Sequence, residues 1–337
     1  MVVLTDINEI ADFTAKRKLH LALGIFDGVH TGHQALLDKV IALSQDKGGS
    51  AGVLLLEPHP QYVFGNCGYQ ILTPVEEKIR LIQSYGDIHI IVQAFTIDFA
   101  TLSGEDFVRD YLLSRYRIST AVCGYNYHFG NKGACSVKEL QDMALRYGFA
   151  SSVLPQVTAN GNTVSSSEVR RLIRLGLMYE AYIRLGHCHV YSGQVVRGKN
   201  LGEKIGFPTA NLEINPQMAL PAYGVYGGFI LDDAGAIHRG IINIGVRPTI
   251  DDGTVLPSFE AHIPGYQGDM YGRRLVVALT DRIRPESRFG SIADLQEQIN
   301  CDIRTAGDAL GVWERFLQEK GLSAHALFTC FIKDYPI

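Results

Sequence analysis

The sequence predicts a doubly wound α/β domain followed by a mainly antiparallel β-barrel domain with C-terminal helices. A chain of 337 residues has room for two hydrophobic cores. Its first half alternates short apolar runs with amphipathic segments, an order typical of a parallel sheet flanked by helices. Its second half has apolar runs separated by turns rich in Gly, Pro and Asp, without helical periods between them, which favours an antiparallel barrel or sandwich.

The predicted strands of the first domain are continuously apolar, which indicates burial on both faces of the sheet. They cover residues 19–26, 51–56, 88–94, 121–124 and 151–154. Apolar residues at spacings of three and four predict helices over 34–44, 75–85, 103–113 and 137–147. A further helix is expected to open near Ser165 and to end at Gly176. Open sheets of this kind bind ligands at the carboxyl ends of their strands, so we expect a site there.

The pattern changes after about residue 187. The predicted strands of the second domain cover residues 189–196, 225–231, 237–244, 259–263 and 274–279. Helix returns at 291–302 and again within 306–319. We place the domain boundary near Gly186, which gives domains of residues 1–186 and 187–337.

The composition excludes several classes of protein. A formal net charge of −4 provides no basic excess for binding nucleic acid or a membrane surface. No apolar run reaches the roughly 18 residues that a membrane span needs, and the first residues have no basic segment leading into an apolar core. The six cysteines form no Cys-x-x-Cys pair, which argues against a structural zinc site or a disulfide framework. We therefore expect a cytoplasmic protein with small-molecule partners.

The first candidate site is the turn after the first predicted strand, Gly24-Ile25-Phe26-Asp27-Gly28-Val29-His30-Thr31-Gly32-His33. Backbone N–H groups and the dipole of the following helix favour phosphate at such a turn, and Gly28 and Gly32 allow close approach of a ligand. Hydrogen bonds donated by His30 and His33 suit the charge that develops on an α-phosphate and a pyrophosphate leaving group. The alternative interpretation is a structural histidine pair.

A second segment, Ser165-Ser166-Ser167-Glu168-Val169-Arg170, has the hydroxyl-rich start of a helix with an arginine in its first turns. Its hydroxyls and N–H groups can hold β- and γ-phosphates, while Arg170 supplies a fixed charge. The alternative here is an ordinary helix N-cap with exposed arginines.

Both segments resemble those of prokaryotic FAD synthetases, which carry a G-x-F-D-G-x-H-x-G-H signature and an S-S-T-x-x-R segment. Further family-like segments follow in order at 57–60, 72–74, 77–78 and 124–130. The resemblance implies a nucleotidyltransferase-like domain that transfers AMP from ATP to FMN. It implies nucleotide contacts from Gly24, Phe26, Asp27, Gly28, Gly32, Asn126, Ser165, Ser166 and Ser167, with catalytic roles for His30, His33 and Arg170. Ser167 replaces the usual threonine and keeps the hydroxyl, whereas His128 stands where arginine is common.

The second half holds another loop, in which Gly198, Gly202 and Gly206 recur every four residues before Pro208. Such a loop can wrap phosphates with its backbone N–H groups, although the spacing is neither a Walker loop nor a dinucleotide fingerprint.

Two side chains after this loop suit a metal ion. Pro208 stiffens the chain before Thr209 and Asn211, whose oxygens lie on one side of an extended segment and suit one hard cation such as Mg²⁺. Glu260, within a strand-like run, is a candidate base for an alcohol; the alternative is a solvent-facing glutamate.

The segment from Gly206 to Asn211 resembles the G-F-P-T-A-N segment of riboflavin kinases, which binds Mg²⁺ and ATP through its Thr and Asn. Other family-like residues follow in order: 243–249, Glu260, 268–272, Arg284, Phe289 and Asp302. The resemblance implies Glu260 as the catalytic base, Thr209 and Asn211 as metal ligands, and nucleotide contacts from Gly198, Gly202, Gly206 and Pro208. Glu203 replaces a residue that is often arginine.

Together the two resemblances span roughly residues 19–304 and identify the chain as a member of the bifunctional riboflavin kinase/FMN adenylyltransferase family. They imply ATP-dependent phosphorylation of riboflavin to FMN, then adenylylation of FMN to FAD with release of pyrophosphate, with Mg²⁺ as cofactor and ATP as co-substrate. One rival hypothesis is a kinase whose first domain is inactive, for which His128 is the hint. The other is a flavin-sensing binding protein, against which His30, His33 and Glu260 argue. Residues 311–337 lie beyond the resemblance and are expected to pack on the barrel.

Overall fold

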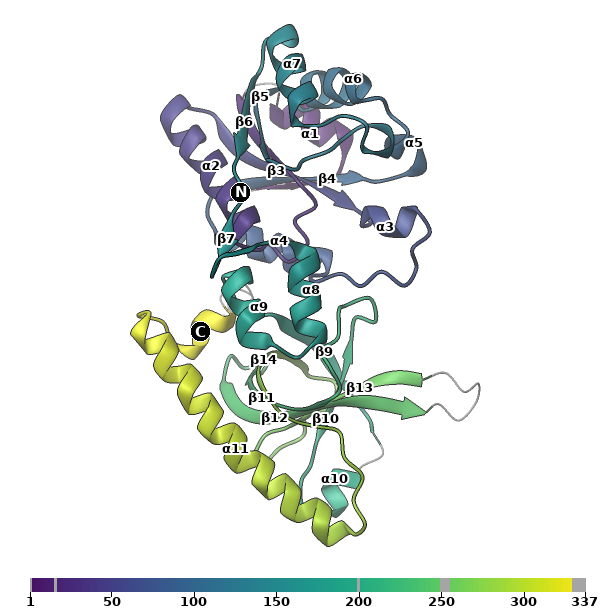
Figure 1. Ribbon diagram of the computed structural model, residues 1–337, viewed down its shortest axis with the longest axis vertical. Helices are drawn as coiled ribbons and strands as arrows, with labels where there is room; N and C mark the ends of the chain where they lie inside the picture. The colour runs from purple at the N-terminus through teal and green to yellow at the C-terminus, as the bar shows by residue number, and fades with distance from the viewer. Residues whose placement is uncertain (1, 15–16, 199–200, 249–254, 329–337) are drawn as a thin grey trace. The chain divides into compact units, whose positions relative to one another are not determined.

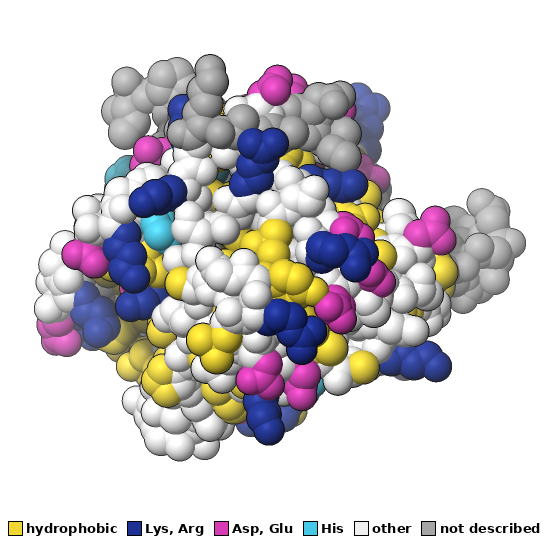
Figure 2. All heavy atoms as spheres, turned by 90° about the horizontal axis from the view of Figure 1, so that it is seen from above, with side chains coloured by type: hydrophobic (Ala, Val, Ile, Leu, Met, Phe, Trp, Pro, Cys, Tyr) yellow, Lys and Arg dark blue, Asp and Glu magenta, His cyan; other side chains and the backbone are white. Residues whose placement is uncertain are grey.

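The computed structural model describes residues 2–14, 17–198, 201–248 and 255–328 (Figure 1). The chain forms two compact units, Met1–Ser166 and Ser167–Ile337. No helix in the described part of the chain is both long and apolar enough to cross a membrane. On the face drawn in Figure 2, Lys and Arg side chains are interspersed with Asp and Glu, which agrees with the small net charge.

The first unit is built on a six-stranded sheet of order β1-β4-β3-β2-β5-β6 in which every neighbouring pair is parallel. Its strands are β1 (Val3–Leu4), β2 (Leu19–Leu23), β3 (Ser50–Glu57), β4 (Ile88–Ala94), β5 (Ile118–Gly124) and β6 (Ala150–Leu154). Five of these strands confirm the sequence-based prediction, and the two-residue β1 was not predicted.

Helices connect these strands and cover both faces of the sheet (Figure 1). They are α1 (Ile7–Thr14), α2 (Thr31–Lys47), α3 (Pro60–Val63), α4 (Val75–Ser84), α5 (Ile97–Ala100), α6 (Gly104–Asp106), η1 (Phe107–Arg115), η2 (Asn131–Gly133) and α7 (Val137–Tyr147). The single helix predicted over 103–113 is α6 continued by the π-helical η1. A two-stranded hairpin, β7 (Thr158–Ala159) with β8 (Asn162–Thr163), precedes the second unit.

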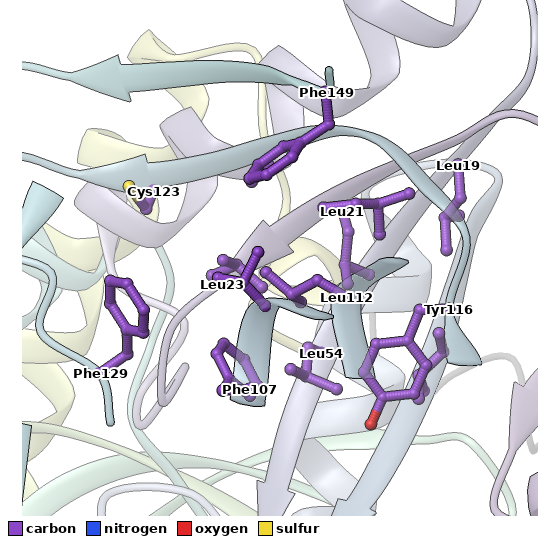
Figure 3. Packing of buried hydrophobic residues seen from close by; sticks show 14 of the residues in the cluster. Leu19, Leu21, Leu23, Leu54, Phe107, Leu112, Tyr116, Cys123, Phe129 and Phe149 are labelled. Carbon is purple, nitrogen blue, oxygen red and sulfur yellow. The ribbon is translucent and has the colours of Figure 1, made fainter. Parts of the chain in front are cut away.

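The core of the first unit follows from the alternation of side chains along β2. Leu19, Leu21 and Leu23 point to one face of the sheet and are at most 1% exposed. Figure 3 shows them packed with Phe107 and Leu112 of η1. Strand β2 is buried, and α2 packs against it. The turn that joins β2 to α2 is therefore fixed at both of its ends.

The second unit is a closed barrel of order β10-β13-β12-β11-β14-β9. Its strands are β9 (Val190–Val196), β10 (Ala210–Ile214), β11 (Gly224–Leu231), β12 (Ile237–Pro248), β13 (Val255–His262) and β14 (Arg274–Pro285). Its helices are α8 (Ser166–Arg174), which opens at the unit boundary, α9 (Met178–Leu185), α10 (Leu201–Lys204), α11 (Ile292–Glu319) and η3 (Ala324–Phe328). The sequence pattern left a barrel and a sandwich open, and the strand pairing closes a barrel.

Two details of the second unit correct the sequence-based prediction. Strand β10 lies where only an extended metal-binding segment was expected. The two predicted C-terminal helices are one continuous helix, α11. Ala306 and Leu310 of α11 are 2% and 1% exposed because they pack on the barrel, and this burial carries the helix through Gly307.

Candidate active sites

In the turn after β2, three of the four residues 26–29 have a left-handed backbone conformation. Phe26 has φ 55°, Gly28 has φ 84° and Val29 has φ 39°. Such a conformation costs a non-glycine residue about 1–2 kcal/mol. Full burial of the Phe26 and Val29 side chains offsets that cost. The turn is therefore a strained but packed structure that begins at Gly24, directly after β2, which is typical of functional sites.

His30 and His33 lie together at the start of α2. Their rings stack with centroids 3.7 Å apart and an angle of 11° between planes. The backbone N–H of His33 donates to His30 Nδ1 over 3.3 Å, so Nδ1 is an acceptor and the ring of His30 can donate only from Nε2. A methyl group at Gly32 would stand 3.2 Å from the His30 ring, so glycine makes room for this stack.

His33 is held in its neutral form. Burial first, then the charges of His30 and Lys78, lower the pKa of His33 well below its ordinary value. Its Nδ1 is buried and has no hydrogen-bond partner among the described residues. His33 can therefore act toward a phosphate as a neutral hydrogen-bond partner, and the histidine pair does not hold two positive charges.

Asp27 organises the turn. Its Oδ1 accepts hydrogen bonds from the backbone N–H groups of Leu72, at 2.8 Å, and Thr73, at 3.2 Å. Its carbonyl oxygen accepts the hydroxyl of Ser166 at 2.8 Å. Ser166 thus contacts the histidine turn within the first unit. The Asp27 side chain is only 1% exposed, so its visible role is to fix the backbone of the turn.

Two charged residues without a predicted role, Glu57 and Lys78, lie with Asp27 in a cluster beside this turn. Lys78, on α4, is 3% exposed, and burial lowers its pKa while Asp27 and Glu57 act in the opposite direction. Burial also raises the pKa of Glu57, which ends β3 next to β2. The sequence signal was a lysine on the buried face of a predicted helix.

The remaining predicted residues of the first site lie apart from the histidine pair in sequence. Asn126 follows β5, the neighbour of β2, at the same carboxyl edge, and its side chain is exposed. His128 is also exposed and contacts the Asn126 carbonyl oxygen at 2.9 Å. Ser167 and Arg170 belong to the second unit, where Arg170 is 7% exposed and its guanidinium lies 3.5 Å from the Ser167 hydroxyl.

Strand register brings the second candidate site together on the barrel. Asn211 of β10 lies directly opposite Glu260 of β13, and Asn243 of β12 lies opposite Glu260 on its other side. Side chains opposite one another in antiparallel strands share a face, with Cβ atoms about 4.5–5.5 Å apart. The barrel therefore places two predicted residues, far apart in sequence, in one polar row. Asn243 belongs to the family-like segment 243–249 and had no predicted role.

Asn211 has the features of a metal ligand. It is 7% exposed, and its Oδ1 is buried without a hydrogen-bond partner among the described residues. An amide oxygen is a hard donor that Mg²⁺ accepts, and Thr209, partly buried two residues earlier, offers a second oxygen. The residues present thus fit the cation that the sequence analysis implied.

Two glycines of the glycine-rich loop, Gly198 and Gly202, lie close to neighbouring residues. A methyl group at Gly198 would collide with the Asn211 side chain, and one at Gly202 would collide with the Phe207 carbonyl oxygen. The loop contains the short helix α10, then Gly206 with φ 84° and the exposed Pro208. Lys199 and Asn200 of this loop, Thr249 of the segment 243–249, and 329–337 of the expected C-terminal packing lie outside the described residues.

Comparisons with known proteins match the two halves of the chain to two different families. Residues 12–168 match a family model described as FAD synthetase, and residues 185–310 match one described as riboflavin kinase. A bifunctional riboflavin kinase/FMN adenylyltransferase of Listeria monocytogenes is 33% identical over 300 residues, which cover 88% of this chain and 91% of that protein.

Two further relatives extend the likeness. The Escherichia coli K12 protein of the same description is 33% identical over 293 residues, covering 87% of this chain and 93% of that protein. A solved structure titled macrolide-efflux protein from Streptococcus pneumoniae superimposes with a TM-score of 0.81 and 25% identity, covering 91% of this chain and 99% of that chain, and this likeness concerns the fold. With two family models in order and relatives matched over most of their length, the chain belongs to the bifunctional riboflavin kinase/FMN adenylyltransferase family.

Proposed function

We propose that residues 187–337 phosphorylate riboflavin to FMN and that residues 1–186 transfer AMP from a second ATP to FMN, releasing pyrophosphate. We propose a boundary near Gly186, the left-handed residue that ends α9, which lies later in the chain than the division between the two compact units at Ser166. The observation that supports the proposal is the strand register that sets Glu260, the proposed base, opposite Asn211, the proposed metal ligand, on one face of the barrel. The enzyme's partners are riboflavin, FMN, FAD and ATP, and we place it in the cytoplasm, where ATP is available.

In the kinase step, the terminal ribityl hydroxyl of riboflavin attacks the γ-phosphorus of ATP. An oxygen–phosphorus bond forms to riboflavin, the bond from the γ-phosphorus to the bridging oxygen breaks, and ADP leaves. Glu260 accepts the hydroxyl proton. Thr209 and Asn211 would hold Mg²⁺, which neutralises phosphate charge when bound. Gly198, Gly202, Gly206 and Pro208 shape the nucleotide loop around them.

In the second step, the FMN phosphate attacks the α-phosphorus of ATP, and the bond to the leaving pyrophosphate breaks. This nucleophile is already ionised, so the site needs no strong base; it needs hydrogen bonds and charge directed at the α-phosphate and pyrophosphate. We assign His30, His33 and Arg170 to this stabilisation. The nucleotide would be held by Gly24, Phe26, Asp27, Gly28, Gly32, Asn126, Ser165, Ser166 and Ser167.

The proposal is tested by variants with opposite effects on the two steps. Glu260→Ala should abolish FMN formation from riboflavin yet leave FAD formation from supplied FMN intact. His30→Ala should do the reverse, lowering FAD formation by about a hundredfold. Glu319→Ala, an exposed glutamate at the end of α11, serves as the matched control and should leave both rates unchanged. Parental kinase turnover in Glu260→Ala would show that the base is another residue.

A further inference from the structure

His262 is a buried side chain beside the kinase site to which no role has been assigned so far. It is the last residue of β13 and is 7% exposed. It lies two residues after Glu260, so both side chains point to the same face of the strand. Strand β10 pairs with β13 at Ala210 and Ala261, and one residue further along this register His262 comes opposite Thr209. The histidine therefore lies where the glycine-rich loop enters the barrel.

The ring of His262 contacts two successive residues of that loop. Its Nδ1 is 2.7 Å from the carbonyl oxygen of Pro208. A carbonyl oxygen can only accept, so Nδ1 carries the proton and donates. The ring also meets the ring of Phe207 edge to face, with centroids 5.7 Å apart and planes at 71°. These contacts join β13, the strand of the proposed base, to the residue that precedes the first proposed metal ligand.

The hydrogen bond to Pro208 restrains the position of Thr209. The carbonyl of Pro208 and the N and Cα atoms of Thr209 belong to one planar peptide unit, so holding the carbonyl oxygen fixes the plane of that unit and the position of the Thr209 Cα atom. Pro208 has no N–H with which to extend the strand ladder. The carbonyl oxygen is therefore the one backbone hydrogen-bonding group of Pro208, and it accepts from His262.

The remaining anchors of the loop hold residues farther from the metal ligands. The N–H of Phe207 donates to the carbonyl of Gly202 at 2.8 Å, which closes a turn within the loop itself. The amide of Gln296 on α11 donates to the carbonyl of Ile205 at 3.0 Å. Both hydrogen bonds involve residues before Pro208. Among the described residues, His262 is the side chain that hydrogen-bonds the peptide unit between Pro208 and Thr209.

We propose that His262 is a positioning residue of the kinase step, which holds Thr209 and Asn211 in the conformation that receives the Mg²⁺–nucleotide complex. The inference rests on the proposed function of the barrel. It assigns His262 no contact with substrate and no proton transfer in the reaction.

The first test measures the local stability of the glycine-rich loop in the protein without ligands. Hydrogen exchange of peptides that cover residues 203–211 should be about tenfold faster in His262→Ala than in the parental protein, because one anchoring hydrogen bond is lost. His262→Asn places an amide nitrogen where Nδ1 lies, so it should restore exchange to within about threefold of the parental rate. His238→Ala removes another barrel histidine, which bonds Asp232, and should leave this peptide unchanged.

The second test separates KM from kcat in the kinase step. His262→Ala should raise the KM for ATP and the Mg²⁺ concentration for half-maximal rate by about tenfold, with His262→Asn close to parental and FAD formation from FMN unaffected. Unchanged loop exchange and unchanged Mg²⁺ dependence in His262→Ala would overturn the inference, as would equal losses in the Ala and Asn variants. If instead the parental protein formed no FMN from riboflavin and ATP, the proposed function would fail, whatever the result at His262.

Discussion

Acid should destabilise the barrel unit through one buried histidine, His189. It lies just before β9, is 5% exposed and meets the ring of Tyr191 edge to face, with centroids 4.8 Å apart. Its Nε2 is buried without a hydrogen-bond partner among the described residues. Burial first, then the charge of His187, lowers the pKa of His189 to about 3.

The size and sign of the effect follow from the difference between folded and unfolded states. In the unfolded chain the histidine has a pKa of about 6.5. Below that pH the unfolded state binds a proton that the folded state does not bind. The contribution of neutral His189 to the free energy of unfolding is fully present above about pH 6.5. It is lost as the pH falls toward 3, at about 1.4 kcal/mol per pH unit. Between pH 7 and pH 5 the free energy of unfolding should fall by about 2 kcal/mol through His189.

The chain's one tryptophan gives the assay its selectivity. Trp313 is 3% exposed, and its Nε1 donates to Asp281 at 2.9 Å within the second unit, so its fluorescence reports unfolding of the barrel. Urea unfolding is measured at pH 7 and pH 5 for the parental protein and His189→Phe, which keeps the aromatic contact but cannot titrate. The parental protein should lose about 2 kcal/mol more than the variant. Equal losses in the two proteins would refute the argument.

Two further substitutions separate the sites. Gly198→Ala introduces a methyl group into the space of the Asn211 side chain. The rate of riboflavin phosphorylation should fall by at least about tenfold, while FAD formation from FMN is unchanged. A parental kinase rate would show that Asn211 can move without loss of activity. Lys78→Met removes the buried ammonium group beside the histidine turn. In steady-state assays of each step, FAD formation should fall by about a hundredfold while kinase activity stays intact. Equal effects on both steps would contradict this prediction.

The strand–helix alternation of the first unit was predictable because its signal is local. Each buried strand, such as β3, is a continuous apolar run, and each helix, such as α7, repeats apolar residues at three and four positions. The turn 24–33 was found because its glycines and histidines are adjacent in sequence. The π-helical η1 was beyond prediction, since it has a different hydrogen-bond period within an ordinary amphipathic pattern.

What sequence could not show is register. Asn211, Glu260 and Asn243 meet because three strands from distant parts of the chain pair in one alignment, and a shift of one residue would turn Glu260 to the other face. The contact between His262 and Pro208 depends on the same alignment. The cluster of Asp27, Glu57 and Lys78 likewise depends on how α4 packs beside the sheet. In each case the residue types were visible, and their meeting required the fold.

Incubation of the pure parental protein with riboflavin, ATP and Mg²⁺, with the flavins identified over time by chromatography, shows whether one chain carries both activities. FMN should appear first and then decline as FAD and pyrophosphate accumulate together. Accumulation of FMN without FAD, or riboflavin that remains bound but unchanged, would contradict it.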